Sequence, residues 1–142
     1  MNYSVFCIQV SPPFEFSSKV QPIALTTKEP KAGTRGVVSG WGSAASGGPT
    51  QVRLHSVSIP IIDREECDRD YAKYGGITSN MICAFEEGQD ACKGDSGSPL
   101  VIEGKLTGIV SFGMGCNVAA FPGVYTNIAT LRNFITYHTG IK

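Results

Sequence analysis

Residues 90–100 read Asp-Ala-Cys-Lys-Gly-Asp-Ser-Gly-Ser-Pro-Leu, which places Ser96 between an aspartate and a glycine. A tight turn of this kind can expose a serine hydroxyl, because glycine tolerates backbone conformations that other residues avoid. By itself, Gly-Asp-Ser is equally typical of an ordinary surface loop between strands. The alternative nucleophile motif Gly-x-Ser-x-Gly is not matched, since Ser98 stands where its last glycine would be. The stretch therefore needs support from other parts of the chain.

That support comes from the spacing of Asp90 and Cys92, of Ser111-Phe112-Gly113 and of Pro122-Gly123-Val124-Tyr125. With these residues the chain resembles the C-terminal half of the trypsin/chymotrypsin family of serine endopeptidases. The resemblance implies that Ser96 attacks the scissile carbonyl and that the backbone N–H groups of Gly94 and Ser96 form the oxyanion hole. It further implies a substrate-binding set, namely Asp90, Ser111, Gly113 and Gly123.

Within that set, the resemblance places Asp90 at the base of the pocket for the side chain that precedes the cut. A buried carboxylate is costly unless it is paired, and a substrate Arg or Lys supplies the partner. Glycine at positions 113 and 123 leaves room for such a long side chain. The alternative is that Asp90 is a solvated loop acid. We expect peptide or protein substrates with Arg or Lys, and protein inhibitors are possible partners.

The composition favours an all-β fold. The chain has 142 residues, 17 glycines and 8 prolines, and its short apolar runs are separated by Gly, Pro and Ser. The resemblance predicts the second antiparallel Greek-key β-barrel of the trypsin-like fold, the last strands of the first barrel, a short helix and a C-terminal helix. Residues 1–36 are expected to be the end of the first barrel and a linker. Residues 37–142 are expected to be the second barrel, and together they form one incomplete peptidase domain.

Individual elements can be predicted as well. We expect strands over 3–10, 51–62, 81–85, 100–102, 106–112 and 123–127. Asp63 with Glu66 three residues later predicts a helix start, and this helix should run to about Lys73. Asn127 can cap a final helix through about His138, which buries Ile128, Leu131 and Ile135 on one face. Trp41 is expected to pack in the core.

Five cysteines are present. The resemblance pairs Cys67 with Cys83 and Cys92 with Cys116, each disulfide being worth about 3 kcal/mol in the chain-entropy model. Gly36 and Ile102 occupy the two positions of a further family disulfide, and Cys7 has no expected partner. The pairing predicts an oxidising, extracellular location. The first residues do not have the pattern of a secretory signal, so we expect a truncated chain.

Three parts of the family's catalytic machinery have no match. The expected general-base histidine is absent, because His55 lies in a strand and His138 in the last helical turn. Asn2 stands at the position of the orienting aspartate. In the family, the aspartate at the position of Asp95 pairs with the ammonium group of a freshly cleaved N-terminus. That N-terminus has an Ile-Val-Gly-Gly-like sequence, and no such start is found in this sequence. We therefore expect Asp95 to be unpaired and the chain to be inactive alone.

Two functions remain open at this point. The first is a trypsin-like endopeptidase represented by its C-terminal half, and the second is a non-catalytic homologue that binds a protein or peptide. The net charge of zero gives no indication of nucleic acid or an anionic membrane as a partner. No apolar run approaches the roughly 18 residues of a membrane span. Residues 113–118 lack the last glycine of a dinucleotide loop, and no zinc-ligand pattern is present, so no cofactor or metal is expected.

Overall fold

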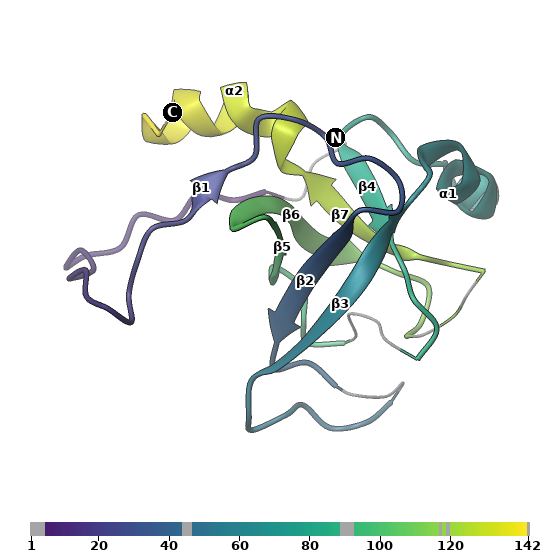
Figure 1. The fold of residues 1–142 in the computed structure, drawn as a ribbon, viewed down its shortest axis with the longest axis horizontal. Helices are drawn as coiled ribbons and strands as arrows, with labels where there is room; N and C mark the ends of the chain where they lie inside the picture. Colours follow the sequence, from purple (N-terminus) through teal and green to yellow (C-terminus); the bar gives the residue numbers. More distant parts are fainter. Residues whose placement is uncertain (1–4, 44–46, 89–92, 117, 119, 142) are drawn as a thin grey trace.

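The computed structural model describes residues 5–43, 47–88, 93–116, 118 and 120–141. Its strands form a closed antiparallel barrel in the order β2-β3-β4-β7-β6-β5, and β5 pairs back onto β2 (Figure 1). A short strand, β1, joins the outside of β6 in parallel. The all-β prediction is confirmed. The strands are β1 (Ala24–Leu25), β2 (Arg35–Gly40), β3 (His55–Ile62), β4 (Met81–Ala84), β5 (Pro99–Ile102), β6 (Lys105–Phe112) and β7 (Gly123–Asn127).

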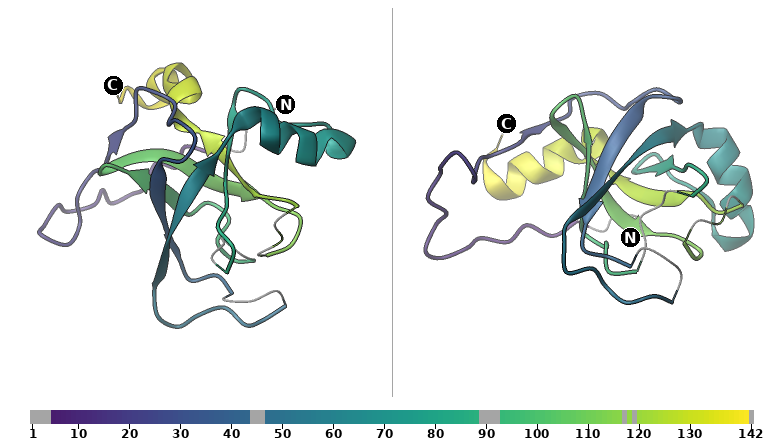
Figure 2. Two further views of the ribbon diagram at one scale, coloured as in Figure 1. Left: turned by 45° about the vertical axis from the view of Figure 1, so that its right-hand side comes forward. Right: turned by 60° about the horizontal axis from the view of Figure 1, so that its bottom comes forward.

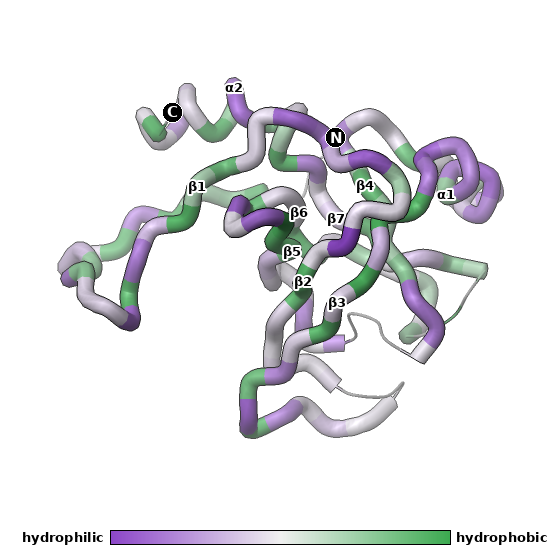
Figure 3. The backbone as a smooth tube through the Cα atoms, in the orientation of Figure 1, coloured by the Kyte–Doolittle hydropathy of each residue, from purple (hydrophilic) through white to green (hydrophobic). Residues whose placement is uncertain are grey.

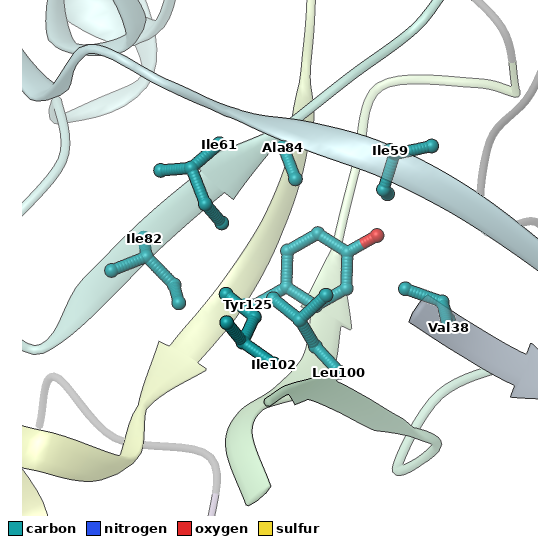
Figure 4. Close-up of a cluster of buried hydrophobic side chains, with 8 residues drawn as sticks. All are labelled: Val38, Ile59, Ile61, Ile82, Ala84, Leu100, Ile102 and Tyr125. Carbon is teal, nitrogen blue, oxygen red and sulfur yellow. The ribbon is translucent and has the colours of Figure 1, made fainter. Parts of the chain in front are cut away.

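The barrel interior is a single apolar cluster to which alternate residues of its strands contribute. The ring of Tyr125 lies among the other side chains of this cluster (Figure 4). Gly108 passes so close that a Cβ there would lie 3.1 Å from both Leu100 Cδ2 and Tyr125 Cβ. The buried set is Val38, Ile59, Ile61, Ile82, Ala84, Leu100, Ile102 and Tyr125.

Two helices flank the barrel on different sides (Figure 2). Helix α1 (Arg64–Tyr71) continues as the 3-10 helix η1 (Ala72–Tyr74), so the predicted end near residue 73 is confirmed. Asp63 caps α1 by accepting hydrogen bonds from the N–H groups of Glu65 and Glu66, as the sequence predicts. Most of α1 is hydrophilic (Figure 3), because it buries only Cys67 and Tyr71.

The C-terminal helix α2 (Ile128–Thr139) lies beside β1 and β6. The side chain of Asn127 accepts a hydrogen bond from Ala129 N, so it caps the helix as predicted. Ile128, Leu131 and Ile135 are the buried residues of α2, which confirms the predicted apolar face. No helix in the described ranges is long and apolar enough to cross a bilayer.

The segment before β2 is held to the barrel by Glu29. One carboxylate oxygen of Glu29 pairs with the guanidinium of Arg64, and the other accepts a hydrogen bond from Asn127 Nδ2 at 3.0 Å. Strand β2 begins at Arg35, two residues before the predicted entry into the barrel. Gly36 and Ile102, which occupy the two positions of the further family disulfide, pack closely against each other. A Cβ on Gly36 would lie 2.9 Å from Ile102 Cγ1.

The predicted strand over residues 3–10 is wrong in its described part, because residues 5–10 have no regular structure. A strand needs a partner, and none of the described strands pairs with this segment. It extends away from the barrel with large apolar side chains exposed, Phe6 at 92% among them (Figure 1).

The predicted strand over 51–62 starts only at His55. Its partner β2 ends at Gly40, which is opposite His55, so the preceding residues have no strand to pair with. Val52 and Leu54 are consequently exposed, whereas Ile59 and Ile61 point inward. The predicted alternation therefore holds for the second half of the segment only.

Candidate active site

The loop that carries Ser96 is fixed to the barrel on its C-terminal side. Gly97 N donates to Val110 O at 2.9 Å, and Val110 N donates to Ser98 O at 2.9 Å, which ties the loop to β6. Ser98 N also closes a turn onto Asp95 O at 2.8 Å. The backbone at Gly94 and Gly97 has φ of 100° and 86°, a region that favours glycine. The Gly-Asp-Ser-Gly sequence is thus required by the turn.

This turn leaves Ser96 exposed, while its neighbour Asp95 is buried. Among the described residues, Ser96 Oγ has no hydrogen-bond partner, and the N–H groups of Gly94 and Ser96 donate to no protein acceptor. Two unengaged N–H donors beside an exposed hydroxyl are the arrangement that stabilises a developing oxyanion. A Cβ on Gly94 would lie 3.2 Å from both Gly42 Cα and Thr50 Cγ2, so a side chain there is tightly restricted.

Asp95, which was expected to lack an ammonium partner, is held by a backbone N–H group. Its Oδ1 accepts a hydrogen bond of 2.8 Å from Gly42 N, and its side chain packs over Gly40 and Gly42. The reason is the absence of side chains on these two glycines, which lets the carboxylate approach the backbone after β2. Because Ser96 is the next residue in the chain, this contact also positions the Ser96 turn.

A cavity of about 440 Å³ opens on one side of Ser96. Three of the residues predicted for the site, Ser96, Ser111 and Gly113, line it together. Gly123 is buried behind the wall, with its Cα 3.9 Å from the point where a Cβ of Gly113 would lie. Asp90, the predicted base of the pocket, is outside the described residues. The lining also includes Lys93, whose role the sequence reasoning missed, although it stands next to Gly94 in the same motif.

A second cavity, of about 560 Å³, is also lined by Ser96. It is lined by Trp41, Leu54 and Pro99 together with small polar residues and glycines. The prediction that Trp41 packs in the core is wrong, because its side chain is 56% exposed. Trp41 follows the last residue of β2, so the chain has already left the barrel at this position. Ser96 therefore lines two hollows, and each of them is bounded by glycines, serines and apolar side chains.

Neither histidine lines either cavity. His55 is exposed at the start of β3, as expected. His138 lies in the last turn of α2, where its ring centroid is 4.5 Å from that of Phe134 and 5.0 Å from that of Tyr137. Asn2, the position matched to the orienting aspartate, lies outside the described residues.

The cysteines follow the predicted scheme where the structure describes them. Cys67 of α1 is bonded to Cys83 of β4, which confirms the first predicted disulfide. Cys116 is also disulfide-bonded, and its expected partner Cys92 is outside the described residues. Cys7 is an exposed free thiol. Within the described part of the chain, no group of three or more acidic, His or Cys residues could hold a metal ion.

Similarity to known proteins extends over nearly the whole chain. The trypsin family model matches residues 1–135. Trypsin alpha-4 of Lucilia cuprina is 44% identical over 136 residues, which are 95% of this chain and 53% of that protein. Trypsin II-P29 of Gallus gallus is 42% identical over 138 residues, which are 95% of this chain and 55% of that protein.

Solved structures give the same result. Neuropsin, described as a serine protease expressed in the limbic system of mouse brain, superposes with a TM-score of 0.82 at 37% sequence identity. The match covers 87% of this chain and 56% of neuropsin. The chain spans about half the length of these relatives. From the closed barrel and these matches, the chain belongs to the trypsin family of serine proteases.

Proposed function

We propose that this chain supplies the nucleophile and the substrate pocket of a trypsin-like serine endopeptidase that cuts after Arg or Lys. The observation that carries the proposal is the exposed Ser96, which lines two cavities and lies beside two unengaged N–H groups. Family membership supports serine-protease chemistry, and the geometry supports the assignment of roles to individual residues.

In this proposal, Ser96 Oγ attacks the carbonyl carbon of the scissile peptide bond and passes its proton to a general base. The carbonyl oxygen becomes an oxyanion that accepts hydrogen bonds from the N–H groups of Gly94 and Ser96. The base then gives the proton to the leaving amine, and the acyl group stays on Ser96 until water releases it. Asp95 holds the turn in place through its contact with Gly42.

The preference for Arg or Lys rests on the cavity beside Ser96. Its volume of about 440 Å³ accepts a long side chain, and the glycine at position 113 leaves the wall open. Asp90 would provide the carboxylate that pairs with the substrate cation, because a buried charge needs an opposite charge. Ser111 would line the pocket with a hydroxyl.

The general base would come from chain outside the sequence given. The hollow bounded by Trp41 and Leu54 is the open side of Ser96 from which such a group could approach. We propose that residues 1–36 are the end of a first barrel and its linker, and that residues 37–142 are the second barrel. The exposed apolar side chains of residues 6–16 support this division, since they would be buried against further strands. With Asn2 at the aspartate position and no matched histidine, the 142-residue chain would be inactive alone.

The second candidate function is a non-catalytic homologue that binds a protein or peptide. The observation that favours it is the absence of either histidine from the two cavities that Ser96 lines. In both cases the disulfide of Cys67 and Cys83 is typical of an oxidising environment, and we propose an extracellular location. Protein substrates and protein inhibitors are the proposed partners.

The two candidates can be separated on the native protein. The protein is recovered from its source with an antibody to α2, and its intact mass is measured before and after treatment with a fluorophosphonate, which phosphonylates activated serines with loss of fluoride. We expect a native mass well above 15.1 kDa and labelling of Ser96, whereas the isolated 142-residue chain stays unlabelled. A native product of 15.1 kDa that is not labelled would rule out catalysis and favour the binding module.

A further inference from the structure

We infer that Lys93 selects substrates that carry an acidic residue next to the Arg or Lys at the cleavage point. This inference deepens the proposed function and rests on it for the position of the peptide. It concerns the cavity of about 440 Å³, which Lys93 lines together with Ser96.

The first support is the distribution of charge around Ser96. Of all the described residues that line the two cavities, Lys93 is the only one with a charged side chain. The other lining residues are glycines, serines, apolar residues and the disulfide-bonded Cys116. Among the described lining residues, a peptide bound over Ser96 therefore meets one charged side chain, the ammonium group of Lys93.

The second support is that this charge is available. Lys93 is exposed, and the two ion pairs among the described residues, Arg35–Glu86 and Arg64–Glu29, do not involve it. The nearest acid in the sequence, Asp95, is buried and accepts its hydrogen bond from Gly42 N. An ammonium without a carboxylate from the described protein can bind one that the substrate brings.

The third support is the fixed position of the Lys93 backbone. Its carbonyl accepts a hydrogen bond of 2.9 Å from Ser43 N, so the residue is anchored where the Ser96 turn begins. Lys93 is followed directly by Gly94, whose N–H is a proposed oxyanion donor. The side chain at position 93 thus starts beside the reacting carbonyl and reaches the residues that flank it.

The expected gain in peptide affinity follows from the exposure of Lys93. A pair formed by an exposed lysine and a mobile carboxylate is weak and is screened by salt. We expect an acidic neighbour to improve binding about two- to fivefold at low salt, which is the range of exposed ion pairs. The gain should largely disappear at 1 M salt.

The test uses two synthetic decapeptides with a single central Arg, one flanked by Glu on both sides and one by Gln on both sides. Their affinities for the full 142-residue chain are measured by fluorescence anisotropy, in a Ser96→Ala background so that no peptide is consumed. The expected result is a two- to fivefold preference for the Glu peptide. Lys93→Gln should abolish the preference and Lys93→Glu should reverse it. Lys105→Gln, at the start of β6 and opposite Ile102 at the far end of β5, is the matched control and should leave the preference unchanged.

Equal affinity for the two peptides, no binding of either, or a preference that survives Lys93→Gln would overturn the inference. Cleavage of the Gln peptide by the native protein with Ser96 intact tests the proposed function separately. A protein that prefers the Glu peptide but cuts neither one refutes the catalytic proposal and leaves the selectivity of Lys93 standing. A protein that cuts and binds both equally refutes the selectivity alone.

Discussion

The substitution Gly42→Ala tests whether the contact between Asp95 and the glycines after β2 positions the Ser96 turn. The three atoms nearest to a Cβ on Gly42 all belong to the Asp95 side chain, and the farthest of them, Oδ1, would be 2.6 Å away. Real Cβ contacts do not reach such distances, so the carboxylate or the backbone must move. The backbone at Gly42 has no positive φ, and the clash is therefore the main cost of the added methyl group.

The magnitude follows from two alternatives. If the carboxylate stays, the overpacked contact costs about 1–3 kcal/mol. If it swings away, it loses the hydrogen bond from Gly42 N, and a hydrogen bond to a charged group is worth about 1.5–3 kcal/mol. The cheaper alternative decides the outcome, so we expect the free energy of unfolding to fall by about 1–3 kcal/mol. With an unfolding entropy of about 2 cal/mol/K per residue, this corresponds to a Tm lower by roughly 3–10 °C.

The assay is urea unfolding followed by the fluorescence of Trp41, which is the only tryptophan of the chain and the residue before Gly42. The control is a double-mutant cycle with Asp95→Ala, which removes all three nearest atoms. In that background Gly42→Ala should cost clearly less than in the parent chain, because the three atoms that the methyl group would meet are gone. The reasoning would be refuted by an equal cost in both backgrounds, or by a single mutant as stable as the parent chain.

Two further predictions concern pH and the cysteines. A hydrogen bond from Arg35 lowers the pKa of Glu86 below its ordinary value of 4.5, so the pair stabilises the fold above that pH and stops doing so as the pH falls through the lowered pKa. The Tm difference between the parent chain and Glu86→Gln should thus be largest near neutral pH and vanish in acid, and a difference that stays constant from neutral pH into acid would contradict this cause. Replacing Cys83 by Ser opens the disulfide with Cys67, which spans 16 residues, and should lower the free energy of unfolding by about 2–4 kcal/mol in chemical denaturation. Cys7→Ser is the matched control and should be neutral, because that thiol is exposed and free; an equal loss in both variants would exclude the cross-link as the cause.

The elements that the sequence predicted well depend on local interactions. Asp63 and Asn127 cap their helices with their own side chains, which accept hydrogen bonds from residues two or three positions later. Such contacts need no information from the rest of the fold. The turn at Ser96 is similar, since its glycines are required by the local backbone conformation.

The errors arose where a distant partner decided the outcome. The first described residues were predicted as a strand, but no described strand pairs with them. The segment before His55 was predicted as part of β3, and its regular pairing stops where β2 ends. Trp41 was predicted as core packing because it is large and apolar. Its exposure is set by the end of β2, which no periodicity in the sequence reveals.

The same division applies to the candidate site. By itself, the sequence determined the resemblance to the trypsin family, because motifs such as Gly-Asp-Ser-Gly are patterns of residue types at fixed spacing. That resemblance predicted the roles of Ser96 and of the pocket glycines, and it predicted the pairing of Cys67 with Cys83 that the structure contains. Only the tertiary structure decided that Asp95 turns inward to Gly42, 53 positions earlier in the chain. The tertiary structure also decided that Lys93 and Ser96 line the same cavity. Both placements depend on the pairing of β2 with β5 in the closed barrel. These two strands are far apart in the sequence, so local sequence patterns do not specify their pairing.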